Sequence, residues 1–206
     1  MNAGSTCGPC KHVEFQFKGA RDYVQGPDIF NALVGVHPAA AVRNVHFTIN
    51  GFVRTPYCEL YQATSREAVG GLQGIKAHAR FELLGVTQWV ALRESSASGS
   101  ADRYDYAEDR VTSLCEVRDG LVVLTGHSPF TFIETVVAMN KHLHQTQFSD
   151  AAGKWLFTSI DLEHGCDARE GISLQIGRDV NYRLTRAEIL LDGQAIGNLC
   201  FALVKR

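Results

Sequence analysis

The sequence has 206 residues, of which 45% are hydrophobic and 20% are charged, and its formal net charge is −2. This composition is typical of a globular protein of one domain or two small ones. The absence of a basic cluster argues against nucleic-acid binding. No apolar run reaches the roughly 18 residues of a membrane span, and the first residues lack the apolar segment of a secretory signal. We therefore expect a cytoplasmic protein with no membrane partner.

The first 11 residues are expected to form a flexible leader. They contain Cys7-Gly8-Pro9-Cys10, which has the same four residues as the thioredoxin redox motif. In that family the motif opens a helix, which lowers the thiol pKa, whereas here it precedes an expected strand. A redox role, a metal role and a tail with two exposed thiols stay open, and the tail fits the position best. The other four cysteines are expected to be small core residues or free thiols.

The first half of the chain is expected to hold one short helix among several strands. The helix runs from Asp28 to about Val34, with Asp28 near the unpaired N–H groups of its first turn. Asn50-Gly51 lies between apolar runs and predicts a hairpin. A Gly-rich loop is expected at 66–74 and a linker at 96–103. The expected strands span residues 12–18, 42–49, 52–63, 77–84 and 87–94.

The second half is expected to hold the longest helix, within residues 126–148. Apolar residues recur there at helical spacing and cover most of the circumference, so the helix should be buried on more than one side. Pro129 suits the first turn of a helix. A hairpin with Asp119-Gly120 at its turn precedes this segment. The strands expected after it span residues 154–162, 172–177, 180–191 and 196–204.

The two halves repeat the same order of elements. Residues 80–84 parallel residues 186–190, and residues 89–93 parallel residues 201–205, at an offset of about half the chain. Each half is one helix followed by several antiparallel strands. Because the helix is apolar nearly all round, the sheet must wrap it rather than cover one side.

This architecture resembles the hot dog superfamily, in which a curved antiparallel sheet wraps a central helix. Two tandem copies resemble its double hot dog members. The resemblance covers residues 12–206 and includes Gly-His-Ser-Pro at 126–129, which is similar to the Gly-His-Phe-Pro element of hot dog dehydratases. It implies an α+β fold with an N-terminal unit at 12–95 and a C-terminal unit at 104–206.

The resemblance also implies chemistry on an acyl thioester of coenzyme A or acyl carrier protein, as in fatty acid or polyketide metabolism. His127 would be the base and Glu134 the acid in dehydration of a 3-hydroxyacyl group. The second activity that the resemblance implies is thioester hydrolysis, in which Glu134 would activate water. A histidine titrates near neutrality, and a carboxyl in an apolar pocket can hold a proton. No metal or other cofactor is implied, and a homodimer is compatible with the sequence.

Five further residues are expected to bind substrate. Gly126 and Ser128 flank His127, while Tyr23, Asp28 and Asn31 belong to a second polar segment before and within the short helix. Turn and capping chemistry explains that segment as well. The alternative function is a non-catalytic acyl-thioester-binding or assembly subunit with a degenerate site.

Structural roles remain open for the candidate catalytic pair. His127 could cap the helix or bond a backbone carbonyl, and Glu134 could pair with Lys141 or with an arginine. His142 and His144 lie two positions apart on a helix, so they cannot face one ligand together, and we expect them at the surface.

Overall fold

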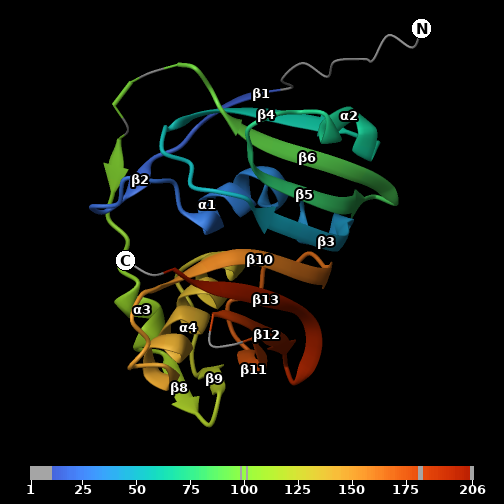
Figure 1. The fold of residues 1–206 in the computed structure, drawn as a ribbon. Coiled ribbons are helices and arrows are strands. Elements are labelled where there is room, and N and C mark those ends of the chain that lie inside the picture. The colour runs from blue at the N-terminus through green and yellow to red at the C-terminus, as the bar shows by residue number, and fades with distance from the viewer. Residues whose placement is uncertain (1–10, 98, 101, 181–182, 205–206) are drawn as a thin grey trace, which may run out of the picture. The chain divides into compact units, whose positions relative to one another are not determined.

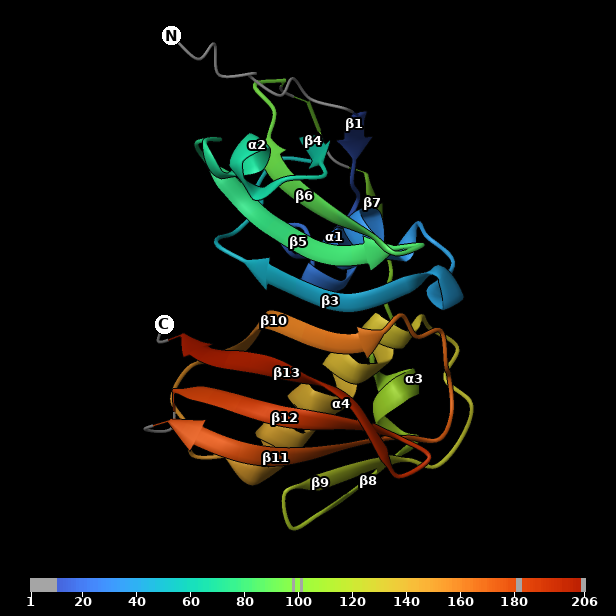
Figure 2. The same cartoon turned by 90° about the vertical axis from the view of Figure 1, so that its right-hand side faces the viewer.

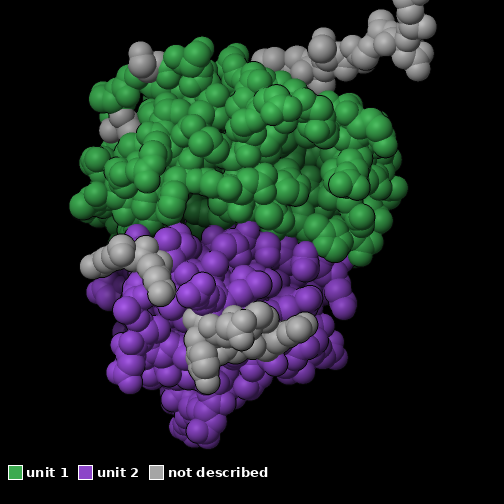
Figure 3. Space-filling view, in the orientation of Figure 1, with its two compact units in different colours: residues 1–106 green, residues 107–206 purple. Residues whose placement is uncertain are grey.

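The computed structural model describes residues 11–97, 99–100, 102–180 and 183–204. The chain divides into two compact units, residues 1–106 and 107–206, which Figure 3 colours separately. Each unit is an antiparallel sheet with a helix against it (Figure 1). The Cys7–Cys10 motif lies outside the described residues.

The first unit is a five-stranded antiparallel sheet in the order β1-β4-β6-β5-β3. Its central helix is α1 (Gly26–Phe30), which continues directly into the π-helical segment η1 (Asn31–Gly35). Figure 2 shows the sheet curving in front of α1. The strands are β1 (Lys11–Glu14), β3 (Val42–Ile49), β4 (Tyr57–Ala63), β5 (Ile75–Leu83) and β6 (Val86–Glu94).

The core of this unit lies between the helix and one face of the sheet. Ile29 and Leu33 from the helix and Phe47 and Phe81 from the sheet are fully buried. The ring of Phe30 meets that of Phe47 edge to face, with 5.4 Å between centroids. Strand alternation places these aromatic rings on the helix side because every second residue shares a face.

Shorter elements complete the first unit, and one of them corrects a prediction. The Gly-rich segment at 66–74 is not a loop throughout, because α2 (Arg66–Gly70) forms there. Ser65 caps this helix by accepting a hydrogen bond from the amide of Ala68. The remaining elements are β2 (Phe17–Lys18), η2 (Ala39–Ala41) and β7 (Arg103–Tyr104).

The predicted hairpin at Asn50-Gly51 is wrong. β3 pairs with β5, while β4 pairs with β1 and β6. The amides of Asn50 and Gly51 both donate to the carbonyl of Lys76, so the chain leaves β3 alongside β5 instead of turning back. By contrast, β5 and β6 do form a hairpin: Leu84 and Gly85 both have positive φ, as a tight β-turn of this kind requires.

The second unit has six strands in the order β8-β9-β11-β12-β13-β10, with the long helix α4 (Phe132–Gln147) against the sheet (Figure 2). The hairpin at Asp119-Gly120 is confirmed. α4 buries Ile133, Val136 and Leu143. The other elements are α3 (Asp109–Thr112), β8 (Cys115–Arg118), β9 (Leu121–Leu124), β10 (Lys154–His164), β11 (Ile172–Val180), β12 (Leu184–Leu191) and β13 (Gln194–Val204).

The start of α4 differs from the prediction. The helix begins at Phe132, so Pro129 precedes it instead of lying in its first turn. Thr131 and Glu134 form a capping box, in which each side chain bonds the other residue's backbone N–H. Glu134 is therefore in the first turn of the helix and not two turns inside it.

His144 is fully buried, so the prediction that it lies at the surface is wrong. Its Nδ1 lies 2.6 Å from the carbonyl oxygen of Asn140, and its Nε2 contacts the hydroxyl of Thr185 on β12. Its ring packs against Trp155 and Phe201. Helical spacing shows which residues share a face, but it does not by itself show which face is buried.

The two sheets share a plan but differ in the placement of their last two strands. In the first unit the final hairpin puts β5 beside β3 and β6 beside β4. In the second unit the final hairpin is reversed, with β12 beside β11 and β13 beside β10. Segments that match in sequence order between the halves therefore do not occupy matching positions in the sheets.

Four cysteines within the described residues are free thiols, as expected: Cys58, Cys115, Cys166 and Cys200. Burial, with Glu94 and Glu59 adding to it, raises the pKa of Cys58 to about 12. Burial raises the pKa of Cys115 to about 11. These two thiols are poor nucleophiles near neutral pH because the thiolate is the reactive form.

Candidate functional site

A cleft of about 570 Å³ opens in the first unit at the start of the central helix. Asp28 and Asn31 line it from the helix, and Tyr104 lines it from β7. The remaining lining residues are Glu14, Phe15, Gln16 and Asp102. The cleft therefore combines three carboxylates, two amides and a phenol with an aromatic wall close to that helix.

Asp28 is the most firmly held polar residue in this cleft. Its Oδ1 lies 3.2 Å from the Nζ of Lys18 and accepts a hydrogen bond of 3.0 Å from the hydroxyl of Tyr104. Lys18 is only 2% exposed. A buried ammonium is costly unless a carboxylate lies beside it, so the pair fixes Asp28 in one position.

This cluster is assembled from three separate segments of the chain. β2 and β7 pair in parallel, which sets Lys18 opposite Tyr104. The Lys18 ammonium also lies over the ring of Tyr106, 4.2 Å from its centroid. Sequence reasoning found Asp28 but missed Lys18 and Tyr104, because no local pattern predicts that parallel pairing.

The residues of the second polar segment predicted from the sequence do not all lie in one place in the structure. Asp28 and Asn31 line the same cleft, with Asn31 at the point where α1 passes into η1. Tyr23 is not among the lining residues, and its ring meets that of Phe52 edge to face at 4.8 Å. The structure thus brings two of the three predicted residues together.

The cleft has the groups that a hydrolytic reaction at a carbonyl carbon needs. A held carboxylate can take a proton from water. Side-chain amides can donate hydrogen bonds to an oxygen on which negative charge develops. Such donors contribute most when packing fixes them before substrate binds.

In the second unit, the predicted catalytic pair lies around the start of α4. His127 is 64% exposed, and its Nδ1 lies 3.6 Å from the carboxylate of Glu170. Glu134 Oε2 accepts hydrogen bonds from the amide (3.2 Å) and the hydroxyl (2.7 Å) of Thr131. The Glu134–Lys141 pair considered from the sequence is replaced by a Lys141–Glu108 pair at 2.7 Å.

The neighbours of His127 have structural partners. Ser128 is fully buried, and its hydroxyl lies 2.6 Å from that of Thr135. Its amide donates to the carbonyl of Arg169. Gly126 is packed against Leu114. These contacts hold the loop before α4 against the rest of its unit.

No group of three or more His, Cys, Asp or Glu side chains that could hold a metal ion occurs in the part of the chain that the structure describes. Within those same residues, none of the helices combines the length and the apolar character that crossing a membrane requires.

No protein-family model and no curated protein sequence matches the chain. Among solved structures, it is similar to a putative thioesterase II from Thermobifida fusca YX, with a TM-score of 0.50, 8% identity and coverage of 98% of this chain and 97% of that one. A protein with a hot dog fold from Alicyclobacillus acidocaldarius has a TM-score of 0.47 at 9% identity, covering 95% and 93%.

A third similar structure is the dehydratase domain of PpsC from Mycobacterium tuberculosis in complex with C12:1-CoA, with a TM-score of 0.43, 9% identity and coverage of 88% and 85%. Identities this low concern the fold alone. The similarity to the Thermobifida fusca structure spans nearly the whole of both chains and shows that the two have the same fold.

Proposed function

We propose that the chain is a double hot dog protein that hydrolyses acyl thioesters of coenzyme A or acyl carrier protein. The observation that supports this best is the carboxylate of Asp28, held by Lys18 and Tyr104 in a cleft beside the central helix. The name of the similar Thermobifida fusca protein, a putative thioesterase, agrees with this choice.

In this proposal Asp28 is the general base. It takes a proton from water, and the hydroxide oxygen attacks the thioester carbon. The side-chain amide of Asn31 donates a hydrogen bond to the carbonyl oxygen as it gains charge, while the Tyr104 hydroxyl continues to hold Asp28. The C–S bond then breaks, and the proton held by Asp28 passes to the departing thiolate, which leaves a carboxylic acid and a free thiol.

The composition of the cleft favours hydrolysis over elimination. Removal of water from a 3-hydroxyacyl group needs a base for the carbon-bound proton and a separate acid for the hydroxyl group. No histidine is among the described residues that line this cleft. The held carboxylate of Asp28, with the amide of Asn31 in the same cleft, suits a reaction in which water is the nucleophile.

Dehydration by His127 and Glu134 is the second candidate. It is supported by the position of the Gly-His-Ser-Pro element directly before the cap of α4. His127 would be the base and Glu134 the acid, with Gly126 and Ser128 beside the substrate. Two hydrogen bonds from Thr131 stabilise the ionised form of Glu134, which makes this carboxyl a weaker candidate for a proton donor.

A comparison of matched variants tests the two candidates. The full chain is incubated with acyl-CoA and 3-hydroxyacyl-CoA substrates, and thiol release and enoyl absorbance are followed. We expect thiol release, and we expect Asp28→Asn to lower kcat by about 100-fold or more. Asp22→Asn is the control, because Asp22 is exposed and pairs with Arg54 at the surface.

Each outcome of this experiment has a defined meaning. Loss of enoyl formation in Glu134→Gln, with Asp28→Asn active, would support dehydration in the second unit. Full activity in Asp28→Asn would overturn the hydrolytic proposal. If both signals stay flat while acyl-CoA still raises the melting temperature, the chain is a non-catalytic acyl-thioester-binding or assembly subunit.

A further inference from the structure

The connection between β4 and β5 crosses the outer face of the first unit's sheet. β6 lies between these two strands, so the chain must pass over β6 to reach β5. α2 lies in this connection and contacts both β4 and β6. In the second unit β11 and β12 are direct neighbours, and no such crossing is needed.

The register of the strands places this crossing opposite the central helix. Phe47 pairs with Ala79, and this face of the sheet meets Phe30 of α1. His78 and Ala91 are paired neighbours on the other face, because successive residues of a strand alternate. Anything bound beneath α2 is therefore separated by the sheet from the core around α1.

A pocket of about 370 Å³ lies beneath α2 on this outer face. Apolar side chains form most of its wall, including Val69, Leu72 and Trp89. Arg66, His78 and Asn50 form its polar part. Its volume is near the lower end of the range for small-molecule sites, about 300–1,000 Å³.

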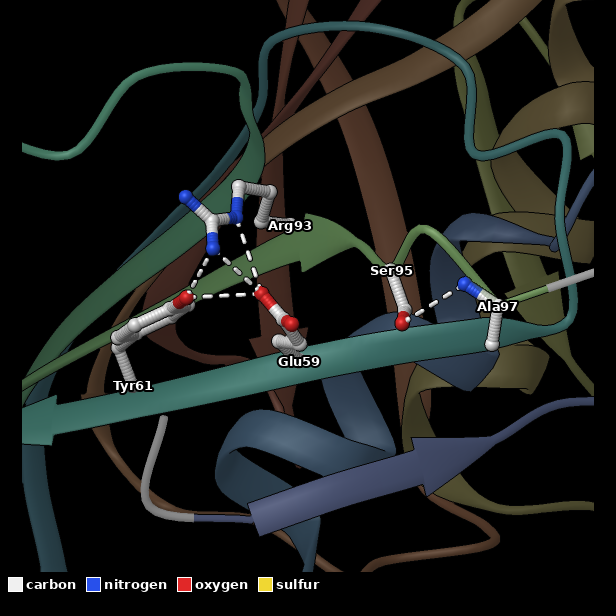
Figure 4. Close-up of polar contacts among 5 residues, drawn as sticks. All are labelled: Glu59, Tyr61, Arg93, Ser95 and Ala97. Atoms are coloured by element: carbon white, nitrogen blue, oxygen red, sulfur yellow. Dashed lines mark hydrogen bonds and ion pairs between the residues drawn. The ribbon is translucent and has the colours of Figure 1, made fainter. Parts of the chain in front are cut away.

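A network of hydrogen bonds fixes the residues next to this pocket, as Figure 4 shows. Tyr61 packs with Val69 and Ala91 beneath α2. Its hydroxyl donates to Glu59 at 2.8 Å, and Arg93 donates to the same carboxylate at 2.6 Å. Hydrogen bonds from Arg93 and then from Tyr61 lower the pKa of Glu59. The charge of Arg93 is thus matched within the protein.

His78 lines the pocket and carries a hydrogen-bond donor on its ring. Its Nδ1 lies 3.2 Å from the side-chain amide nitrogen of Asn50. An amide nitrogen donates and does not accept, so Nδ1 accepts and the proton of the neutral ring is on Nε2. Burial, with Arg66 adding to it, lowers the pKa of His78, which keeps the ring neutral near pH 7.

Arg66 differs from Arg93 because its charge is not matched. Among the described residues no ion pair or hydrogen bond to the Arg66 side chain occurs. No carboxylate is among the described residues that line the pocket. The polar part therefore offers a guanidinium fork and an imidazole N–H, two kinds of donor that suit the paired oxygens of a carboxylate.

We propose that this pocket binds a small monocarboxylate with a compact apolar body. The carboxylate oxygens accept hydrogen bonds from Arg66 and His78, and the apolar body contacts Trp89 and Leu72. This site is separate from the Asp28 cleft, and its occupancy does not depend on thioester hydrolysis.

Binding of 4-phenylbutyrate to the full chain tests this site. Titration is followed by calorimetry and by the NMR signal of the Trp89 indole N–H, assigned with the Trp89→Phe variant. We expect saturable binding that shifts this signal. The neutral analogue 4-phenylbutanamide and the short acid acetate are expected to bind with an affinity at least about tenfold lower. The amide lacks the charge, and acetate lacks the apolar body.

Two matched variants complete the test. Arg66→Gln should weaken 4-phenylbutyrate binding by about tenfold or more, and its exposed position allows the fold to be retained. Arg43→Gln, at an exposed arginine that does not line the pocket, should bind like the parent chain. Equal affinity for the amide, unchanged affinity in Arg66→Gln, equally tight binding of inorganic phosphate, or no saturable binding at millimolar concentrations would each overturn the proposal. Because binding is measured directly, these outcomes are distinct from a failure of thioester hydrolysis.

Discussion

Two buried polar side chains of this protein, Lys18 and His144, have partners in distant segments of the chain. Lys18 meets Asp28 and Tyr104, and His144 meets Thr185. A carbonyl oxygen only accepts, so His144 donates from Nδ1 to Asn140 and accepts at Nε2 from the Thr185 hydroxyl. Each contact ties a helix or loop to one strand and so specifies how that unit is assembled.

At the residue scale we predict that Thr185→Val destabilises the protein. Valine has nearly the same shape but removes the donor, leaving the buried Nε2 of His144 without its hydrogen bond. The free energy of unfolding should fall by about 1–3 kcal/mol, measured by urea denaturation. Thr146→Val is the control, because Thr146 is exposed on α4, the helix that contains His144. The control should change the free energy of unfolding by less than about 0.5 kcal/mol. Equal losses in the two variants would contradict this account of His144.

At the scale of single elements, the capping box sets where α4 begins. Thr131 accepts from the amide of Glu134, and Glu134 accepts from the amide of Thr131. These bonds satisfy backbone donors that the first turn would otherwise leave unpaired. The cap also explains why Glu134 is half-buried at the start of the helix.

We predict that Thr131→Ala lowers the free energy of unfolding by about 1 kcal/mol. The loss comes from backbone N–H groups left without a protein partner, and denaturant titration followed by circular dichroism measures it. Gln145→Ala, an exposed change in the last turn of the same helix, serves as the reference and should change stability by less than about 0.5 kcal/mol. If both variants unfold alike, the capping box does not stabilise α4.

Elements that depend on local signals were predictable from the sequence. The strand at 42–49 and the hairpin at Asp119-Gly120 are confirmed. The helix at 66–70 was not predicted, because the glycines of this segment indicate a loop, although Ser65 has the position of a helix cap. The start of α4 was also open to prediction, since Thr131 and Glu134 have the spacing of a capping box.

The candidate site was predictable only in part, because its partners are not local. Asp28 and Asn31 were singled out from the sequence, and both line the cleft. Lys18 and Tyr104 were not, since their proximity depends on pairing between strands at opposite ends of the first unit. The catalytic roles of His127 and Glu134 remain predictions.

At the scale of the whole molecule, the two units reach similar sheets by different routes. The repeat in the sequence predicted the order of elements but not the orientation of the final hairpin in the sheet. Matching segments at 80–84 and 186–190 lie in β5 and β12, which have different neighbours. Turn signals show that two strands form a hairpin, but they do not show which of the two will face a given third strand.

The reversed hairpin has a consequence for folding kinetics. In the second unit, β11, β12 and β13 form a meander whose closing pairs, Val180 with Leu184 and Leu191 with Gln194, are near neighbours along the chain. In the first unit, β4 pairs with β6, which lies much later in the chain. The pairing of Cys58 with Glu94 therefore requires closure of a long loop. Nucleation should therefore be faster in the meander. Pulse-labelled amide exchange during refolding should protect β11–β13 before β4, and the opposite order would show that loop closure does not set the rate.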